Sequence, residues 1–294
     1  MLKKFLAKYY SLTNLLLPVL PRSVTNDIYP NFIYKYFSFD DNKHYQDILI
    51  RDSLYFSSPK YFNDPFDCSL DIKFRRKSKY FLANYLTNKI LPYEIENISK
   101  ETKMSAKTFI KNNFLHFDPS VPSNEKIHQK IQRDFVLSSG ISCFSEFNNN
   151  ILMWSHYSCK HTGFCVEFNI NELIKALVNY NIDNKIDGLL SRVIYKSNWP
   201  YLSGYDKDPW VDSLYIKSSN WKYEKEWRIF LPQENGIRMT LPPNVVSAIY
   251  IGLQTEPEKE AIIKKATAAK SYKINIFKAM KVANKFALSF KKLN

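Results

Sequence analysis

Glycine is scarce in this chain, and the scarcity limits the folds that are open to it. The 294 residues include 6 glycines. Average usage of roughly 7% would give about 20. No GxGxxG string occurs, and no GxxxxGK string followed by Ser or Thr, although both phosphate-binding loops need glycine where the backbone approaches the ligand. The sequence therefore gives no support to a Rossmann dinucleotide-binding fold or to a P-loop fold.

The charge balance favours a negatively charged partner. Lys and Arg number 42 against 28 Asp and Glu, so the formal net charge is +14. A field of this sign attracts nucleic acid, another polyanion or an anionic substrate, and it does not choose among them. Aromatic side chains make up 16% of the residues, and they serve either as base-stacking platforms or as filling for the core.

Cysteine usage and the N-terminal segment bear on the compartment. Cys68, Cys143, Cys159 and Cys165 form no CxxC pair and are too sparse for a disulfide-stapled domain, so we expect reduced thiols and a cytoplasmic protein. Residues 1–25 form a basic and apolar tail whose longest apolar run, residues 15–20, is too short for a signal peptide or a membrane helix. We expect no transmembrane segment, and the sequence indicates no oligomeric state.

Short strand-forming segments alternate with helical ones along most of the chain. The patterns predict strands at residues 32–36, 54–56, 141–144, 164–168, 192–195, 227–231, 245–251 and 273–277, and helices near 45–49, 151–157, 171–180 and 257–269. Residues 75–138 lack strand alternation and indicate a helical insertion. We therefore predict a single α+β domain over residues 26–294, with a mixed, largely antiparallel sheet core, flanking helices and a helical insertion at about 75–138.

A proline-containing turn at residues 61–67 (YFNDPFD) is the first candidate ligand site. Asn63 and the two carboxylates Asp64 and Asp67 either bind a cation or a ribose, or they accept backbone N–H bonds and simply make the turn. We expect Phe62 and Phe66 to anchor the turn in the core.

The second candidate site combines a strand end with a helix and the turn that follows it. Its ligand-binding candidates are Ser145, Trp154, His156, Tyr157 and His161. His156, Tyr157 and His161 each have an ordinary alternative role as hydrogen-bonding groups that fix a helix end. The spacing of these histidines from the cysteines matches no standard zinc pattern, so we expect no metal site here. A Cys–His nucleophile pair, Cys159 with His156, is a further alternative.

The third candidate site lies in residues 221–228 (WKYEKEWR). If Glu224 and Glu226 both enter the following strand, their carboxylates project from one face, because residues two apart share a side. Like charges raise one another's pKa unless a cation such as Lys222 or Arg228 intervenes. Such a pair is suited to acid–base chemistry or to binding a ribose hydroxyl. The alternative is a salt-bridged strand entry.

Together these strings resemble the bacterial family catalogued as domain of unknown function 2971. The resemblance rests on residues 34–36, 62–67, 143–146, 153–157, 161–164 and 221–228, and it covers about residue 33 to the C-terminus. That family has no assigned activity, so the resemblance marks which residues to examine.

A more distant similarity is to the ADP-ribosyltransferase fold. In that fold a first strand offers His or Arg to the nicotinamide nucleotide, a middle strand and helix offer Ser or Tyr, and a late strand offers a Glu that stabilises an oxocarbenium ion. Lys35, then Ser145 with Tyr157, then Glu224 and Glu226 follow the same order here. Lys35 stands where His or Arg is expected, and a lysine reproduces neither an imidazole ring nor a guanidinium fork. The similarity implies NAD as a substrate and no metal.

Three hypotheses follow. The first is an ADP-ribosyltransferase-like enzyme that binds a nucleotide or nucleic acid in a basic cleft, with Glu226 or Glu224 as the catalytic carboxylate. The second is a non-catalytic nucleic-acid-binding module that uses the positive charge and exposed rings. The third is a metal-dependent nuclease built on Asp64, Asp67, Glu224 and Glu226. The enzyme hypothesis predicts that one cleft is lined by Asn63, Asp64, His156, Glu224 and Glu226.

Overall fold

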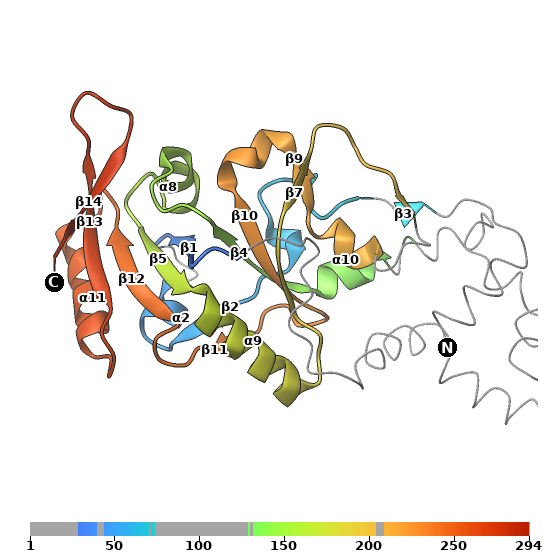
Figure 1. Ribbon diagram of the computed structural model, residues 1–294, viewed down its shortest axis with the longest axis horizontal. Coiled ribbons are helices and arrows are strands. Elements are labelled where there is room, and N and C mark those ends of the chain that lie inside the picture. The colour runs from blue at the N-terminus through green and yellow to red at the C-terminus, as the bar shows by residue number, and fades with distance from the viewer. Residues whose placement is uncertain are drawn as a thin grey trace, which may run out of the picture.

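An eight-stranded sheet organises the protein. The computed structural model describes residues 29–39, 44–70, 72–73, 129, 132–203 and 209–293. The predicted N-terminal tail and most of the predicted helical insertion lie outside these residues. The strand order is β14-β13-β12-β5-β1-β4-β10-β6, and every neighbouring pair is antiparallel except β12 and β13. The predicted α+β class with a large, mostly antiparallel sheet is confirmed (Figure 1).

The strands of this sheet are short. A helical segment, residues 132–138, comes directly before β4. In chain order the strands are β1 (Phe32–Phe37), β4 (Gly140–Ser145), β5 (Phe164–Asn169), β6 (Leu189–Arg192), β10 (Glu226–Leu231), β12 (Val246–Ile251), β13 (Asn275–Lys281) and β14 (Leu288–Lys292). The predicted strand at 192–195 is two strands, because β6 pairs with β10 whereas β7 pairs with β9. The predictions omitted β14, since its lysines hide the alternating pattern.

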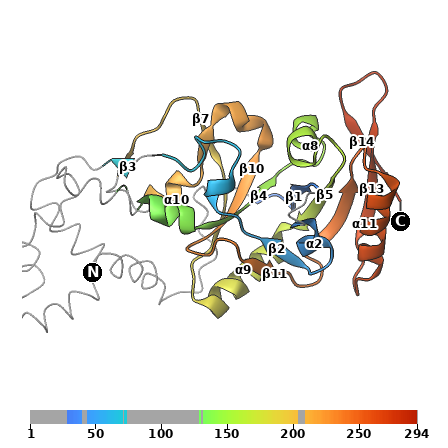
Figure 2. The ribbon, with the colours of Figure 1, turned by 180° about the vertical axis from the view of Figure 1, so that it is seen from behind.

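Three two-stranded ladders extend the fold at its margins. They pair β2 (Ser53–Tyr55) with β11 (Arg238–Thr240), β3 (Ile72–Lys73) with β8 (Leu202–Ser203), and β7 (Ile194–Lys196) with β9 (Ile216–Ser218). The helices are α2 (His44–Leu49), η1 (Pro59–Tyr61), α8 (Ile151–Tyr157), α9 (Ile170–Asn184), α10 (Pro209–Ser213), η3 (Ser219–Glu224) and α11 (Pro257–Ala268). Both ribbon views place α11 beside β13 at one end of the sheet and α10 with β7 and β9 at the other (Figures 1 and 2).

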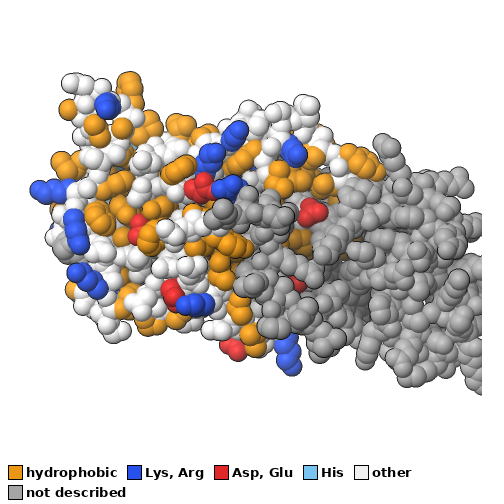
Figure 3. Space-filling view, viewed as in Figure 1, with side chains coloured by type: hydrophobic (Ala, Val, Ile, Leu, Met, Phe, Trp, Pro, Cys, Tyr) orange, Lys and Arg blue, Asp and Glu red, His pale blue; other side chains and the backbone are white. Residues whose placement is uncertain are grey.

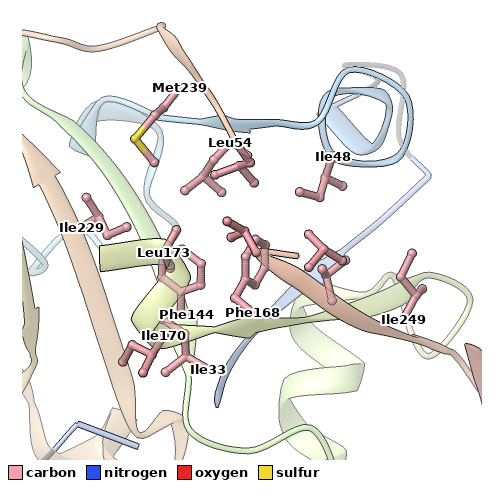
Figure 4. Packing of buried hydrophobic residues seen from close by; sticks show 14 of the residues in the cluster. Ile33, Ile48, Leu54, Phe144, Phe168, Ile170, Leu173, Ile229, Met239 and Ile249 are labelled. Carbon is pink, nitrogen blue, oxygen red and sulfur yellow. The ribbon is translucent and has the colours of Figure 1, made fainter. Parts of the chain in front are cut away.

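The main core lies on one face of the sheet. Strand alternation sends Phe144, Phe168 and Ile229 to this face, where Leu173 of α9 and Leu54 of β2 pack among them (Figure 4). Burying such a side chain stabilises the fold by about 1.5–3 kcal/mol. The opposite face of β10 carries Glu226, Arg228 and Phe230, so this strand is buried on both sides.

Two asparagines explain where the helices next to the sheet begin. The Asn169 side chain accepts hydrogen bonds from the backbone N–H groups of Asn171 and Glu172 at the start of α9. Asn150 does the same for Leu152 and Met153 at the start of α8. Asparagine is a preferred N-cap because its side-chain oxygen satisfies backbone donors that have no partner within the helix. Asn150 Nδ2 also donates to the Tyr223 carbonyl at 2.9 Å, so the same residue joins α8 to η3.

Candidate functional site: a buried ionic cluster

Glu224 and Glu226 lie on two different elements. Glu224 is the last residue of the 3₁₀ helix η3, and Glu226 is the first residue of β10. Lys225 between them has φ 46°, in the left-handed region. The expectation that both carboxylates belong to one strand face is therefore wrong. They meet instead because the left-handed residue turns the chain between them, and both are buried, at 2% and 4% exposure.

Lys217 of β9 joins the carboxylates. Its Nζ donates to Glu224 Oε2 at 2.6 Å and to Glu226 Oε2 at 3.0 Å. Asp67 Oδ2 lies 3.5 Å from the same nitrogen, and the Trp221 ring centroid lies 5.1 Å from it. Burial lowers the pKa of Lys217, but the charges of Glu226 and Asp67 outweigh burial and raise this pKa above its ordinary value. The amine is therefore a permanent cation.

The Arg228 guanidinium closes the other side of the cluster. Its Nη1 and Nη2 donate to the two oxygens of Asp67 at 2.9 and 2.6 Å. Its Nε donates to Glu226 Oε1 at 2.7 Å, and Nη1 also reaches the Leu214 carbonyl at 2.6 Å. The planar fork of an arginine can satisfy two carboxylates at once, which the single ammonium of a lysine cannot do. Asp67 and Glu226 are thus held rigidly by Arg228.

The two glutamates differ in how easily they ionise. Burial raises the pKa of Glu226, but the charges of Arg228 and Lys217 outweigh burial and lower it to about 2. Burial also raises the pKa of Glu224, the negative charge of Glu226 raises it further, and Lys217 only partly opposes this rise. Glu226 is therefore ionised at neutral pH, whereas ionising Glu224 costs more free energy.

Tyr157 connects Glu224 to the surface. Its hydroxyl, on the last residue of α8, donates to Glu224 Oε1 at 2.6 Å. Asn63 Nδ2 donates to the Tyr157 oxygen at 3.4 Å, and Asn63 is exposed. Burial and the charge of Glu224 both raise the pKa of Tyr157, so the hydroxyl keeps its proton. Asn63, Tyr157 and Glu224 form a polar path from solvent to the cluster.

Ser145 positions the backbone of Glu224, the buried end of this polar path. Its hydroxyl donates to the Glu224 carbonyl at 2.6 Å and accepts from the Phe147 N–H at 3.2 Å. The strand register also aligns Ser145 with Tyr34 of β1 on one side and Glu226 of β10 on the other. Ser145 therefore holds the backbone that carries Glu224.

Lys35 lies near the cluster without entering it. The register between β1 and β4 has the single pair Tyr34 with Ser145, so the carbonyl of Cys143 is free of that ladder. Lys35 Nζ donates to this carbonyl at 3.1 Å and lies 5.5 Å from the centroid of the Phe144 ring. Burial lowers the pKa of Lys35, while the charges of Cys143 and Glu226 oppose the change.

Of the two carboxylates in the turn at residues 61–67, Asp67 and not Asp64 joins the cluster. Asp64 Oδ1 accepts from the Phe66 N–H at 2.9 Å, an ordinary turn bond, while Asp67 reaches the cluster. Phe62 lies 5.5 Å from the Arg228 guanidinium and is half-buried. Phe66 is 65% exposed, so the expectation that both rings anchor the turn in the core is wrong for Phe66. The Phe66 ring lies edge to face against Trp199, 6.2 Å away between centroids.

The remaining candidates of α8 divide between surface and core. His156 is exposed, 6.3 Å from the Tyr157 ring between centroids. Trp154 is fully buried, and its Nε1 donates to the Asn148 carbonyl at 2.6 Å. The His161 ring stacks on Trp154 at 6.1 Å. Asn63, Tyr157, Glu224 and Glu226 thus come together, whereas Asp64, Trp154 and His161 serve local structure.

A metal has no evident place among the residues that the structure describes. These residues contain no group of three or more His, Cys, Asp or Glu side chains arranged to hold a metal ion. The three clustered carboxylates Asp67, Glu224 and Glu226 face Lys217 and Arg228 instead, and those cations occupy the positions that a divalent ion would need. The nuclease hypothesis therefore gains no support from this cluster.

Among the residues that the structure describes, no helix has both the length and the apolar composition needed to cross a membrane.

Sequence reasoning missed the central role of Lys217, and it also missed Tyr195. The Tyr195 hydroxyl accepts from the Glu226 N–H at 2.9 Å. Lys217 follows the apolar residues 214–216, and a single charge at the end of such a run was an available signal for a buried ion pair.

The fold and the site define an α+β protein with a buried ionic cluster that Tyr157 and Asn63 connect to the surface. Residues 153–229 match the family model described as protein of unknown function (DUF2971), and the predicted resemblance to that family is confirmed over these residues. The matched segment includes Tyr157, Lys217, Glu224, Glu226 and Arg228, but not Asn63 or Asp67. No significant match was found among curated proteins or among solved structures.

Proposed function

We propose that this protein is an ADP-ribosyltransferase-like enzyme that acts on a nucleotide or nucleic-acid substrate, with Glu224 as its catalytic carboxylate. The observation that carries the proposal is the polar path from exposed Asn63 through Tyr157 to Glu224. A buried carboxylate with a raised pKa and a route to solvent is typical of an acid–base or electrostatic catalyst.

Between the two glutamates, Glu224 is the better candidate. Glu226 accepts from Arg228 through Oε1 and from Lys217 through Oε2. Both of its oxygens are therefore occupied by cations. Glu224 Oε1 accepts from the neutral Tyr157 hydroxyl instead of from a cation, so this oxygen keeps more of its negative charge for a substrate.

The order of the strands supports the enzyme class. β1, β4 and β10 are neighbours in the sheet, and the ADP-ribosyltransferase fold carries its substrate-binding and catalytic residues on a first, a middle and a late strand. Here Glu224 ends the 3₁₀ helix that comes directly before the late strand β10. In such a transfer the bond from the ribose carbon to nicotinamide breaks and a bond to an acceptor oxygen forms. Glu224 would stabilise the oxocarbenium ion and take up the acceptor proton, with Tyr157 and Asn63 orienting the ribose.

Nicotinamide release from NAD tests this function. The full chain is incubated with NAD alone, with single-stranded nucleic acid and with protein acceptors, and nicotinamide is quantified. We expect release that Glu224→Gln reduces about 10²–10³-fold, because one preorganised electrostatic partner is lost. No release by the unaltered protein with any acceptor would overturn the transferase proposal.

A second candidate function is nucleic-acid binding without catalysis. Exposed rings lie around the same turn: Tyr61 and Phe66 are 73% and 65% exposed, and Phe66 meets Trp199 edge to face at 6.2 Å. Base stacking on such rings contributes about 1–3 kcal/mol per base. Binding that depends on Trp199 and weakens steeply with salt, without NAD turnover, would favour this function.

A further inference from the structure

The hairpin formed by β13 and β14 has features that neither the buried cluster nor the proposed function uses. It lies at the edge of the eight-stranded sheet and projects beyond the other elements in both ribbon views (Figures 1 and 2). The loop at its tip is ordered by backbone bonds, from the Val282 N–H to the Ala287 carbonyl at 3.1 Å and from the Lys285 N–H to the Val282 carbonyl at 3.3 Å. The tip is a defined, convex structure.

An apolar side chain stands at this tip without cover. Phe286 is 99% exposed, and Met280 on the adjoining strand is 45% exposed. A phenylalanine that stays in water forgoes the stabilisation that burial gives to the other rings of the fold. Because the tip is convex, this ring is not placed to join the protein's own core.

The charge around this ring is of one sign. Residues 271–293 contain six lysines and no aspartate or glutamate. Lys281 and Lys285 flank the tip, and Lys291 and Lys292 lie exposed on the outer strand. The space-filling view shows hydrophobic and basic side chains together on the hairpin, with further basic side chains down the same flank (Figure 3).

Acidic residues at the start of α11 lie near the base of the hairpin, and two of them are paired with lysines. Glu256 pairs with Lys259 at 3.1 Å. Glu260 pairs with Lys278 at the base of the hairpin. Neither pair involves Lys281 or Lys285, so both of these lysines can face an external anion.

We propose that the β13–β14 hairpin docks on the surface of an anionic lipid bilayer, with Phe286 among the acyl chains and the lysines facing the headgroup phosphates. A bilayer supplies the apolar phase that a convex, ring-bearing tip requires, and an anionic surface complements the lysines. Single-stranded nucleic acid is the poorer occupant. It stacks its bases on rings that line a groove, whereas the loop at this tip presents one isolated ring.

Vesicle co-sedimentation of the full chain tests the proposal. We expect binding to vesicles of phosphatidylcholine with phosphatidylglycerol, and none to phosphatidylcholine alone. Phe286→Asp should weaken this binding at least about tenfold, because it removes the inserted ring and repels the surface. Ile182→Asp is the matched control, since Ile182 is an apolar residue 64% exposed on α9, and it should weaken binding much less.

A tryptophan at the hairpin tip distinguishes insertion of the tip into the bilayer from general electrostatic attraction, because the protein carries a net charge of +14. The emission of a Phe286→Trp variant should shift to the blue on adding anionic vesicles and stay unchanged on adding single-stranded nucleic acid. Lys281→Gln with Lys285→Gln should weaken vesicle binding by about fivefold per lysine. No binding to anionic vesicles at low salt, equal effects of Phe286→Asp and Ile182→Asp, or an emission shift with nucleic acid alone would overturn the proposal.

Discussion

Tyr157 and Glu224 are 67 residues apart in the chain, and the tyrosine hydroxyl donates a 2.6 Å hydrogen bond to the glutamate carboxylate. The contact depends on the register between α8 and η3, which Asn150 sets through its bond to the Tyr223 carbonyl. The candidate site is therefore built from a helix C-terminus and a 3₁₀ helix C-terminus that one asparagine holds together.

The Tyr157 hydroxyl should matter more for turnover than for stability. Tyr157→Phe removes one hydrogen bond to a carboxylate and should lower the free energy of unfolding by about 1–2 kcal/mol. Under the proposed function it should also lower nicotinamide release strongly, because the path from Asn63 is cut. Tyr61→Phe, at a tyrosine 73% exposed, is the control. Equal turnover by both variants would remove Tyr157 from the site.

The two glutamates should respond differently to the same substitution. Glu226→Gln leaves Arg228 and Lys217 short of a buried counter-charge and should destabilise the fold by about 3–5 kcal/mol. Glu224→Gln removes the carboxylate with the raised pKa and should cost much less stability while lowering turnover about 10²–10³-fold. Urea unfolding and nicotinamide release of both variants measure the two effects. A larger loss of stability for Glu224→Gln would contradict the assignment.

Arg228 should be among the most sensitive positions of the described structure. Arg228→Met strands Asp67 and Glu226 without their main cation and should destabilise the protein by about 3–5 kcal/mol. Lys175→Met is the control, because Lys175 pairs with Glu172 at 2.7 Å and the two side chains are 67% and 35% exposed. That exposed pair is worth less than about 1 kcal/mol. Similar melting temperatures for the two variants would show that the cluster contributes little.

Acid should unfold the protein through Glu226. Its pKa in the folded state is about 2, below its usual 4.5, so the folded state binds the proton more weakly than the unfolded state does. Its stabilising contribution is complete above pH 4.5 and is lost as the pH falls from 4.5 towards 2. Glu224 acts in the opposite sense, because its raised folded pKa makes ionisation costly as the pH rises. Urea midpoints across this range should fall less steeply in Glu226→Gln than in the unaltered protein.

Thiol labelling should separate the four cysteines. Cys159 is exposed, whereas Cys68 and Cys165 are buried, and burial raises the pKa of both buried thiols. A thiol reacts as its thiolate, so brief treatment with N-ethylmaleimide should modify Cys159 first. Peptide mass spectrometry identifies the modified residue. Equal labelling of Cys165 under native conditions would contradict its burial.

Local sequence pattern was sufficient for most strands and helices, because their side-chain periods and caps act over a few residues. Phe32–Phe37 and Ile151–Tyr157 were predicted nearly to the residue. The pattern failed where a single residue changes the backbone direction. Lys225, in the left-handed region, ends η3 and starts β10, and no spacing rule places Glu224 and Glu226 on separate elements.

The amino-acid sequence by itself determined the α+β class, the candidate strings and their order along the chain, since all three depend on residue type and local spacing. Only the tertiary structure decided which charges meet. Asp67 and Arg228 pair across 161 residues, and Lys217 comes from a third segment. Ion pairing depends on distance in space and on exclusion of water. Strand register and one left-handed residue set both quantities here, and neither can be derived from the spacing of residues in the sequence.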